Sequence, residues 1–328
     1  MYNVITIGDA VIDTHVQIND ASVECDINNK NCQLCLDYAA KIPVTDSFQI
    51  LGGNAANIAC GTTKLGLKST IITTLGKDSN GKLIQQELKK YGVDTSLVGT
   101  DSQTKTRYSI VLNFQGERTI LSYHQKRNYH WPKKMPATDW VYYTSLSEGF
   151  ENLQNKLFDY LKKHPTVRLA YNPGSFQIKS ALPKVRQTIA KSDIVCLNIE
   201  EAETILNTTL KKEKSISALI HQLTQLGAKE VVVTDAIRGA TAGDDDEIWQ
   251  IKSFPVKVMA KTGAGDAFSS GYLAARFAGH NMPNALLWGI ANSSSVIGQL
   301  GAQKGLLDKN GIKKISAKFS NIKAKKIL

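Results

Sequence analysis

The chain has 328 residues, of which 42% are hydrophobic, as in an ordinary soluble protein with room for one large α/β domain or two smaller ones. No apolar run approaches the ~20 residues that span a bilayer, and the N-terminus enters a strand-like run directly, so we expect a cytoplasmic protein without a membrane partner. The net charge of +11 could indicate nucleic acid binding, but much of it lies in a basic C-terminal tail, residues 308–328. With Phe319 as its one aromatic residue, this segment is interpreted as a solvated tail, and we do not expect nucleic acid as a partner.

Strand-like and helix-like segments alternate along most of the chain. In chain order, the sequence predicts a strand at 4–8, a helix at 54–65, a strand at 69–74, a helix at 81–91, a strand at 140–143, a helix at 150–163, strands at 168–171, 194–197 and 230–234, and a helix at 264–278. This alternation is typical of βαβ units with right-handed crossovers. We therefore predict one α/β domain over residues 1–328, with a central, mainly parallel sheet flanked by helices on both faces. Ligands of such sheets bind outside the carboxyl ends of the strands.

Two segments interrupt the alternation. Residues 14–49 contain no good amphipathic helix, and residues 105–124 resemble a hairpin that turns at Gln115 and Gly116. We expect a small β-sheet lid from discontinuous segments, about 14–50 and 104–125, whose uncovered edge strand could pair in a homodimer. The alternative is a pair of long surface loops, but loops over ~15 residues in a compact domain are usually functional or disordered.

The five cysteines are expected to be reduced thiols in a cytoplasmic protein. Cys32 and Cys35 have the C-x-x-C spacing of metal and redox motifs, and Cys25 is close by. No fourth ligand follows in sequence, so the simpler interpretation is a loop with incidental thiols.

Two N-terminal segments place ligand-binding side chains at strand and helix ends. Asp9 and Asp13 follow the first strand at the rim where ligands bind, and either could hold a diol. Gly52 and Gly53 permit close approach of a ligand, and the amides of Asn54 and Asn57 in the first turn of the next helix suit sugar hydroxyls. The structural alternative is a simple Gly-Gly turn with Asn54 as the N-cap.

The segment Thr262-Gly263-Ala264-Gly265-Asp266 predicts a phosphoryl-transfer site. Its glycines lie where the first N–H groups of a helix are unpaired, and such a terminus binds anions. A carboxylate facing a phosphate would be repelled unless it removes a proton from the attacking hydroxyl, which is the role we assign to Asp266. A P-loop is excluded: the near match over residues 61–69 has the wrong spacing and leads from a helix into a strand.

These segments resemble the signatures of the PfkB, or ribokinase-like, family of carbohydrate and nucleoside kinases. Residues 52–57 match its N-terminal signature, residues 262–268 match its C-terminal one, and residues 75–81 match a G-x-D-x-x-G segment between them. The resemblance runs nearly end to end and implies transfer of the γ-phosphoryl of ATP to a hydroxymethyl group of a small sugar.

The resemblance also implies roles for individual residues. Asp266 would be the catalytic base, and the backbone of Gly263, Ala264, Gly265 and Asp266 would form the anion hole. The acceptor would be held by residues of the two N-terminal segments: Asp9, Asp13, Gly52, Gly53, Asn54 and Asn57. ATP would be bound by Asn198, Thr234, Gly239, Thr262, Asn292, Gly301 and Ala302. Glu201, in an N-x-x-E motif, would help to arrange Mg²⁺ through water; without the resemblance, it belongs to the acidic first turn of a helix.

The chain departs from the family pattern in two places. Ala260 and Lys261 replace an Asp-Thr pair that helps to bind activating potassium, which makes a monovalent cation (K⁺) doubtful as a cofactor. Ala236 stands where members usually have glycine, so the loop over the ATP phosphates could differ.

The sequence leaves four alternatives open. An adenosine-type nucleoside kinase would use Tyr108, Phe114, Tyr123 or His124 to stack on a base, although aromatics in a hairpin are more often packing residues. A sugar-phosphate kinase would use Lys105, Arg107 or Arg118. A non-catalytic ligand sensor could keep the same fold, and the basic tail could recruit nucleic acid.

Overall fold

A computed structural model describes residues 1–26, 32–259, 262–299 and 301–328. Its largest sheet, within these residues, has nine strands in the order β17-β16-β15-β14-β13-β12-β11-β1-β6. Six of them run parallel: β1 (Tyr2–Ile7), β6 (Ser69–Ile72), β11 (Thr138–Tyr143), β12 (Arg168–Tyr171), β13 (Ile194–Asn198) and β14 (Glu230–Thr234). The antiparallel edge consists of β15 (Ala240–Gly243), β16 (Ile248–Ile251) and β17 (Lys325–Lys326). The predicted mainly parallel sheet is confirmed.

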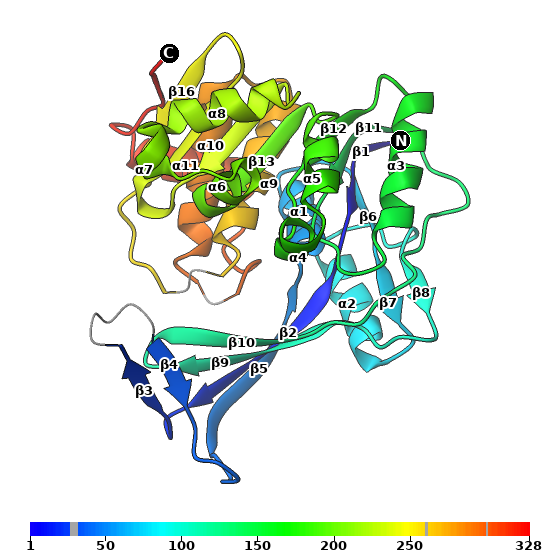
Figure 1. Ribbon diagram of the computed structural model, residues 1–328, viewed down its shortest axis with the longest axis vertical. Helices are drawn as coiled ribbons and strands as arrows, with labels where there is room; N and C mark the ends of the chain where they lie inside the picture. Colours follow the sequence, from blue (N-terminus) through cyan, green and yellow to red (C-terminus); the bar gives the residue numbers. More distant parts are fainter. Residues whose placement is uncertain (27–31, 260–261, 300) are drawn as a thin grey trace.

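Alternate residues of the parallel strands point to opposite faces, and helices cover both (Figure 1). Val141 and Val231 pack into one core with α3 (Glu151–Lys163), α5 (Leu182–Ile189), α6 (Ile199–Leu206) and α8 (Ile216–Gln225). Their neighbours Tyr142 and Val232 pack into another with α1 (Asn54–Lys64), α9 (Ala264–Phe277), α10 (Met282–Val296) and α11 (Lys309–Lys318). The same body also contains α2 (Ser79–Lys90), α4 (Ser175–Ser180), α7 (Leu210–Glu213), the short 3-10 helix η1 (Ala236–Arg238) and the paired strands β7 (Thr74–Gly76) and β8 (Gly99–Asp101).

A separate four-stranded sheet projects from this body, and we call it the lid (Figure 1). Its order is β10-β9-β2-β5, with β2 (Val11–Ile18), β5 (Val44–Gly52), β9 (Tyr108–Phe114) and β10 (Glu117–Tyr123). The turn between β9 and β10 falls at Gln115 and Gly116, as predicted. The small separate sheet is therefore confirmed, and the proposed lid segments, 14–50 and 104–125, contain most of its residues.

The prediction of five reduced cysteines is wrong. The strands β3 (Ser22–Cys25) and β4 (Cys32–Cys35) form an antiparallel hairpin whose register places Cys25 opposite Cys32, and the two are joined by a disulfide with their Cα atoms 4.0 Å apart. Cys35, the other half of the C-x-x-C spacing, is free. The sequence predicted a loop with incidental thiols, whereas these residues form two paired strands whose register, which the C-x-x-C spacing does not reveal, places Cys25 opposite Cys32.

The C-terminal segment is also more ordered than a solvated tail. Ile312 of α11 is 2% exposed and packs against the body, and β17 extends the main sheet by pairing with β16. The lysines of this segment nevertheless remain on the surface. In the part of the chain that the structure describes, no helix is long and apolar enough to cross a membrane.

Candidate active site

The N-terminus of α9 presents backbone N–H groups beside a carboxylate. Ala267 makes the first helical hydrogen bond here, to the carbonyl of Gly263, so the N–H groups of residues 264–266 precede the helical ladder. Gly263 is the N-cap with φ of +76°, and a Cβ there would lie 2.3 Å from the Cβ of Ala302, so glycine is required on both grounds. A Cβ on Gly265 would meet no described atom within 4 Å, which leaves the approach to these N–H groups open. This end of the helix has the geometry of an anion site.

Asp266 lies in the first turn of α9, half-buried, and is held by a side chain from α1. The Asn57 Nδ2 donates to Asp266 Oδ2 at 2.7 Å. Burial raises the pKa of Asp266 to about 6, although the Asn57 hydrogen bond opposes the rise. The carboxyl is therefore mostly ionised at neutral pH while remaining basic enough to accept a proton. The amide of Asn57, which we predicted to hold an acceptor, is directed at the carboxylate.

The Gly-Gly segment brings the end of β5 against the strand that enters the lid. Gly53 has φ of +92°, and a Cβ on it would lie 2.4 Å from the carbonyl of Asp9. Gly53, not Asn54, is the N-cap of α1. The Asn54 amide instead donates to Asn172 Oδ1 at 3.4 Å. Gly52 adjoins the Asp13 carboxylate, whose pKa is raised by burial although Ser109 donates to it.

Asn198 and Glu201 form a capping box at the start of α6. Asn198 Oδ1 accepts from the Glu201 N–H at 2.8 Å, and the Glu201 carboxylate accepts from the Asn198 N–H at 3.0 Å. Burial, with smaller contributions from the charges of Asp266 and Glu200, raises the pKa of Glu201 to about 7. The charge of Asp266 therefore acts on the Glu201 carboxyl, so the two carboxyls are electrostatically coupled.

The predicted ATP-binding residues lie in three places in the structure. Thr234 ends β14 beside Asn198, and Gly239 follows η1 with φ of +104°. Gly301 and Ala302 belong to the segment that packs against Gly263. Asn292, by contrast, is fully buried and bonds to Ala267, Ser270 and Leu307, so its amide is engaged inside the protein rather than in an open groove.

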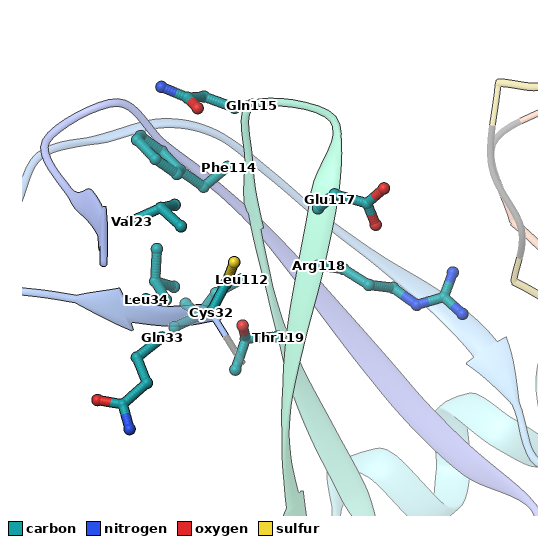
Figure 2. A pocket seen from close by; sticks show the side chains of 10 residues that line it. All are labelled: Val23, Cys32, Gln33, Leu34, Leu112, Phe114, Gln115, Glu117, Arg118 and Thr119. Carbon is teal, nitrogen blue, oxygen red and sulfur yellow. The ribbon is translucent and has the colours of Figure 1, made fainter. Parts of the chain in front are cut away.

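The lid reaches the α9 terminus through Arg118 of β10. Its guanidinium donates to the Thr262 hydroxyl, and its charge also acts on Asp13. A pocket of about 400 Å³ lies elsewhere on the lid, between the β3–β4 hairpin and the tip of β9–β10. Figure 2 shows Val23, Leu34 and Phe114 gathered on one side of it, with Arg118 pointing away from them. Arg118 thus lines the edge of this pocket while its guanidinium is directed away from the apolar side chains and donates to Thr262.

Buried charges meet where the lid joins the body. Asp9, 2% exposed, forms an ion pair with Arg107, and Arg107 also donates to His124. Partial desolvation and the charge of Arg107 lower the pKa of His124 to about 4, so His124 is neutral at physiological pH. Asp9 therefore has a charged partner within the protein, whereas the more open Asp13 accepts a hydrogen bond from Ser109.

Four residues at the site make contacts that the sequence did not predict. Asn172 links Asn54 to the carbonyl of Cys196, and Gln303 donates to Asn57 and to the Leu51 carbonyl. Arg107 and Arg118 were considered for an acceptor phosphate, yet each has a partner on the protein. For Gln303 a signal existed, because it directly follows the predicted Gly301 and Ala302; the other contacts depend on long-range packing.

Ala260 and Lys261, which replace the potassium-binding Asp-Thr pair of the family, lie outside the described residues. Among those described, no group of three or more His, Cys, Asp or Glu is placed to hold a metal ion. A single half-buried carboxylate, Glu201, still fits Mg²⁺, which usually keeps several waters and binds through one or two carboxylates with substrate phosphates.

Comparison with known proteins finds relatives among kinases. The ATP-dependent 6-phosphofructokinase of Thermoanaerobacterium thermosaccharolyticum is 24% identical over 324 residues, covering 95% of this chain and 93% of the relative. The ribokinase of Haemophilus influenzae is 24% identical over 266 residues, covering 79% of this chain and 85% of the relative. Among solved structures, Arabidopsis thaliana ribokinase complexed with ribose and ATP superposes with a TM-score of 0.79 at 20% identity, covering 96% of this chain and 98% of that one. A Methanocaldococcus jannaschii nucleoside kinase superposes with a TM-score of 0.76 at 18% identity, covering 97% of this chain and 99% of that one.

The family assignment rests on the match of the pfkB family carbohydrate kinases to residues 21–310. This range includes both glycine-rich segments, the capping box of α6 and the whole of α9. The chain belongs to the pfkB family of carbohydrate kinases, which are phosphotransferases with an alcohol group as acceptor.

Proposed function

We propose that this chain transfers the γ-phosphoryl group of ATP to a hydroxymethyl group of a small sugar, as a ribokinase or fructokinase does. The observation that carries the proposal is the position of Asp266. Its carboxylate lies in the first turn of α9, beside the N–H groups of the anion site, with a pKa of about 6. A base is useful there only if a hydroxyl is to be deprotonated next to a phosphate.

Each group at the site has a separate task in this mechanism. Asp266 removes the proton from the acceptor hydroxyl, and the N–H groups of Gly263, Ala264, Gly265 and Asp266 stabilise charge that develops on the phosphoryl oxygens. MgATP, when bound, supplies the phosphoryl group. Glu201 holds waters of Mg²⁺, with its position fixed by the capping box with Asn198. Structures of related ribokinases with ATP or ADP support the nucleotide.

Most of the remaining predicted residues keep their proposed roles as binding groups, whereas Asp9 and Asn292 are engaged within the protein. Asp13, Gly52, Gly53 and Asn54 surround the acceptor beside Asn57, and Asp9 supports them through Arg107. Thr234, Gly239, Thr262, Gly301 and Ala302 line the nucleotide side, with Asn292 supporting α9 from behind. K⁺ stays doubtful as an activator because the expected Asp-Thr pair is absent from the sequence.

The lid favours a sugar over a nucleoside. Tyr108 and Tyr123 stack on one another across β9 and β10 with ring centroids 5.0 Å apart, and Phe114 is 8% exposed in the lid pocket. His124 is bound to Arg107. The aromatic residues considered for stacking on a base thus have partners within the lid or at its base, and the nucleoside kinase becomes the second alternative.

A sugar phosphate is a further candidate acceptor, favoured by Arg118. Its guanidinium donates to the Thr262 hydroxyl and its charge acts on Asp13, so it could pair with an acceptor phosphate by exchanging the Thr262 hydroxyl for a charged partner. The phosphofructokinase relative agrees with this possibility. We also propose a homodimer that pairs through the edge strand β10, and a cytoplasmic location.

The decisive experiment measures ADP release from MgATP with ribose, fructose, 2-keto-3-deoxygluconate, fructose 6-phosphate, adenosine, cytidine and inosine, with and without potassium. We expect one free sugar to give the highest kcat/KM. A preference for fructose 6-phosphate that is lost in Arg118→Met would transfer the assignment to a sugar-phosphate kinase. Preference for a nucleoside would overturn the sugar assignment, and ATP binding without turnover of any acceptor would favour a ligand sensor.

A further inference from the structure

We propose that Gln303 is a positioning residue for phosphoryl transfer: it fixes the Asn57 amide so that its nitrogen, rather than its oxygen, faces Asp266. The inference rests on the proposed function, in which Asp266 is the base. It adds a residue that touches neither substrate nor the carboxylate, and it explains how Asp266 is held as an acceptor of protons.

The hydrogen bonds run outward from Gln303, to the lid junction on one side and through Asn57 to the base on the other. Gln303 Nε2 donates to the Leu51 carbonyl at 2.9 Å and to Asn57 Oδ1, and Asn57 Nδ2 donates to Asp266 Oδ2 at 2.7 Å. A backbone carbonyl and an ionised carboxylate can only accept, so both ends of this chain set its direction. Neither amide can rotate by half a turn without placing two acceptors against each other.

Burial makes this orientation matter. Gln303 is 6% exposed and Asn57 is 7% exposed, so solvent has little access to replace a lost donor. Without Gln303, the Asn57 amide could turn its oxygen toward a protonated Asp266, which would stabilise the neutral acid. With Gln303 in place, Asn57 remains a donor, and the ionised form of Asp266 is favoured.

Other charged or titratable groups face Asp266 from different elements. Glu201 on α6 and Tyr142 on β11 both have their pKa raised in part by the charge of Asp266. From the lid, Arg118 reaches the neighbouring Thr262. These groups act on Asp266 through their charges, which do not depend on how the Asn57 amide is turned. The hydrogen bond that Asn57 donates to the Asp266 side chain does depend on the orientation of that amide.

The test is the pH dependence of kcat/KM for the preferred acceptor, at saturating MgATP, in Gln303→Met. This variant keeps similar length and removes the donor. We expect the acid limb to move upward by about 1 pH unit, the lower end of the range for one hydrogen bond to a charged group. At high pH, where Asp266 is ionised regardless, kcat should return to within a few-fold of wild type with little change in KM.

Three companion variants separate positioning from general damage. Gln154→Met removes another buried amide, far from the site on α3, and should leave the acid limb in place. Asn57→Leu should shift the limb by itself, and adding Gln303→Met should shift it no further if Gln303 acts through Asn57. Recording the profile in Glu201→Gln as well separates the titration of Glu201 from that of Asp266.

The outcomes distinguish this inference from the function on which it rests. If Asp266→Asn is inactive at every pH but Gln303→Met keeps the wild-type acid limb, the positioning role is wrong and the proposed function stands. If Asp266→Asn retains activity, the base assignment itself fails. Should Gln303→Met not fold, Gln303→Leu removes the same donor without adding a charge, and an unshifted acid limb there would equally overturn the inference.

Discussion

The body and the lid are stabilised by different interactions. In the body, strand residues alternate between two apolar cores, and side chains such as Tyr142 and Val231 are fully buried. The lid has less to bury: β10 is exposed along most of its length, with Ile120 48% and Leu121 53% exposed. At the base of the lid, Ile12 and Leu51 pack into an apolar cluster with α1, and the buried ion pair of Asp9 and Arg107 adds a charged contact. The body is therefore stabilised by apolar packing throughout, whereas the lid combines apolar packing at its base with a buried ion pair.

The largest expected effect comes from the body. Asp266→Asn keeps the shape of the side chain but removes the base, so turnover should fall by roughly 10²–10⁴-fold. ATP affinity should change little, because the backbone N–H groups remain at the end of α9. Steady-state kinetics and nucleotide titration check both expectations, and unchanged turnover would contradict the mechanism.

The second prediction tests the charged attachment of the lid. Arg107→Met leaves the Asp9 carboxylate buried without its ion-pair partner, and we expect a loss of about 3–5 kcal/mol in the free energy of unfolding, measured with denaturant. Adding Asp9→Asn should recover much of the loss.

The matched control for this ion pair is Lys126→Met. Lys126 pairs with Glu148 on the surface, where the two side chains are 72% and 60% exposed, and its loss should cost less than about 1 kcal/mol. Equal effects of the two substitutions would show that burial does not distinguish these pairs. If Arg107→Met lowers activity without lowering global stability, the lid unfolds separately from the body.

The same difference explains what the sequence could predict. The alternation of apolar segments predicted the parallel sheet, and β12 and β14 begin and end at the predicted residues. The Gly-Ala-Gly-Asp segment predicted the anion site because a helix terminus, its glycines and its carboxylate are all adjacent in sequence. The described structure places all these parts together at the start of α9.

Contacts between distant segments could not be predicted in this way. Arg107 lies almost a hundred positions after Asp9, and Gln303 lies far beyond Asn57; their pairing depends on how the lid strands return to the body. The Cys25–Cys32 pair depends on hairpin register, which a shift of two residues would change. Asn292 looked available for ATP, although its burial between α9 and the segment at Leu307 became visible only in the structure.

The third prediction concerns the tip of the lid. The disulfide closes a short loop, and the chain-entropy estimate for such a loop is about 2–3 kcal/mol. Because the β3–β4 hairpin stands apart from the body in Figure 1, we expect Cys25→Ser to loosen the hairpin without moving the global unfolding transition.

Limited proteolysis followed by mass spectrometry measures this local change. Cleavage near β3 and β4 should become faster in Cys25→Ser and in reduced wild type, whereas Cys35→Ser, which removes the free thiol, should behave as wild type. A lowered global transition in Cys25→Ser would show that the lid tip and the body unfold together.

The smallest expected effect compares two alanines with positive φ. Ala236, in the loop after β14, has φ of +42°, and Ala39, in the segment before β5, has φ of +62°. Glycine relieves the steric strain of this conformation but adds freedom to the unfolded chain, so each replacement should gain less than about 1 kcal/mol. Because Ala236 belongs to the body, Ala236→Gly should raise the global unfolding midpoint, while Ala39→Gly should leave it unchanged and slow proteolysis of the lid. Equal shifts of the global midpoint would mean that body and lid form one cooperative unit, and the difference in how the two are stabilised would then carry no consequence for stability.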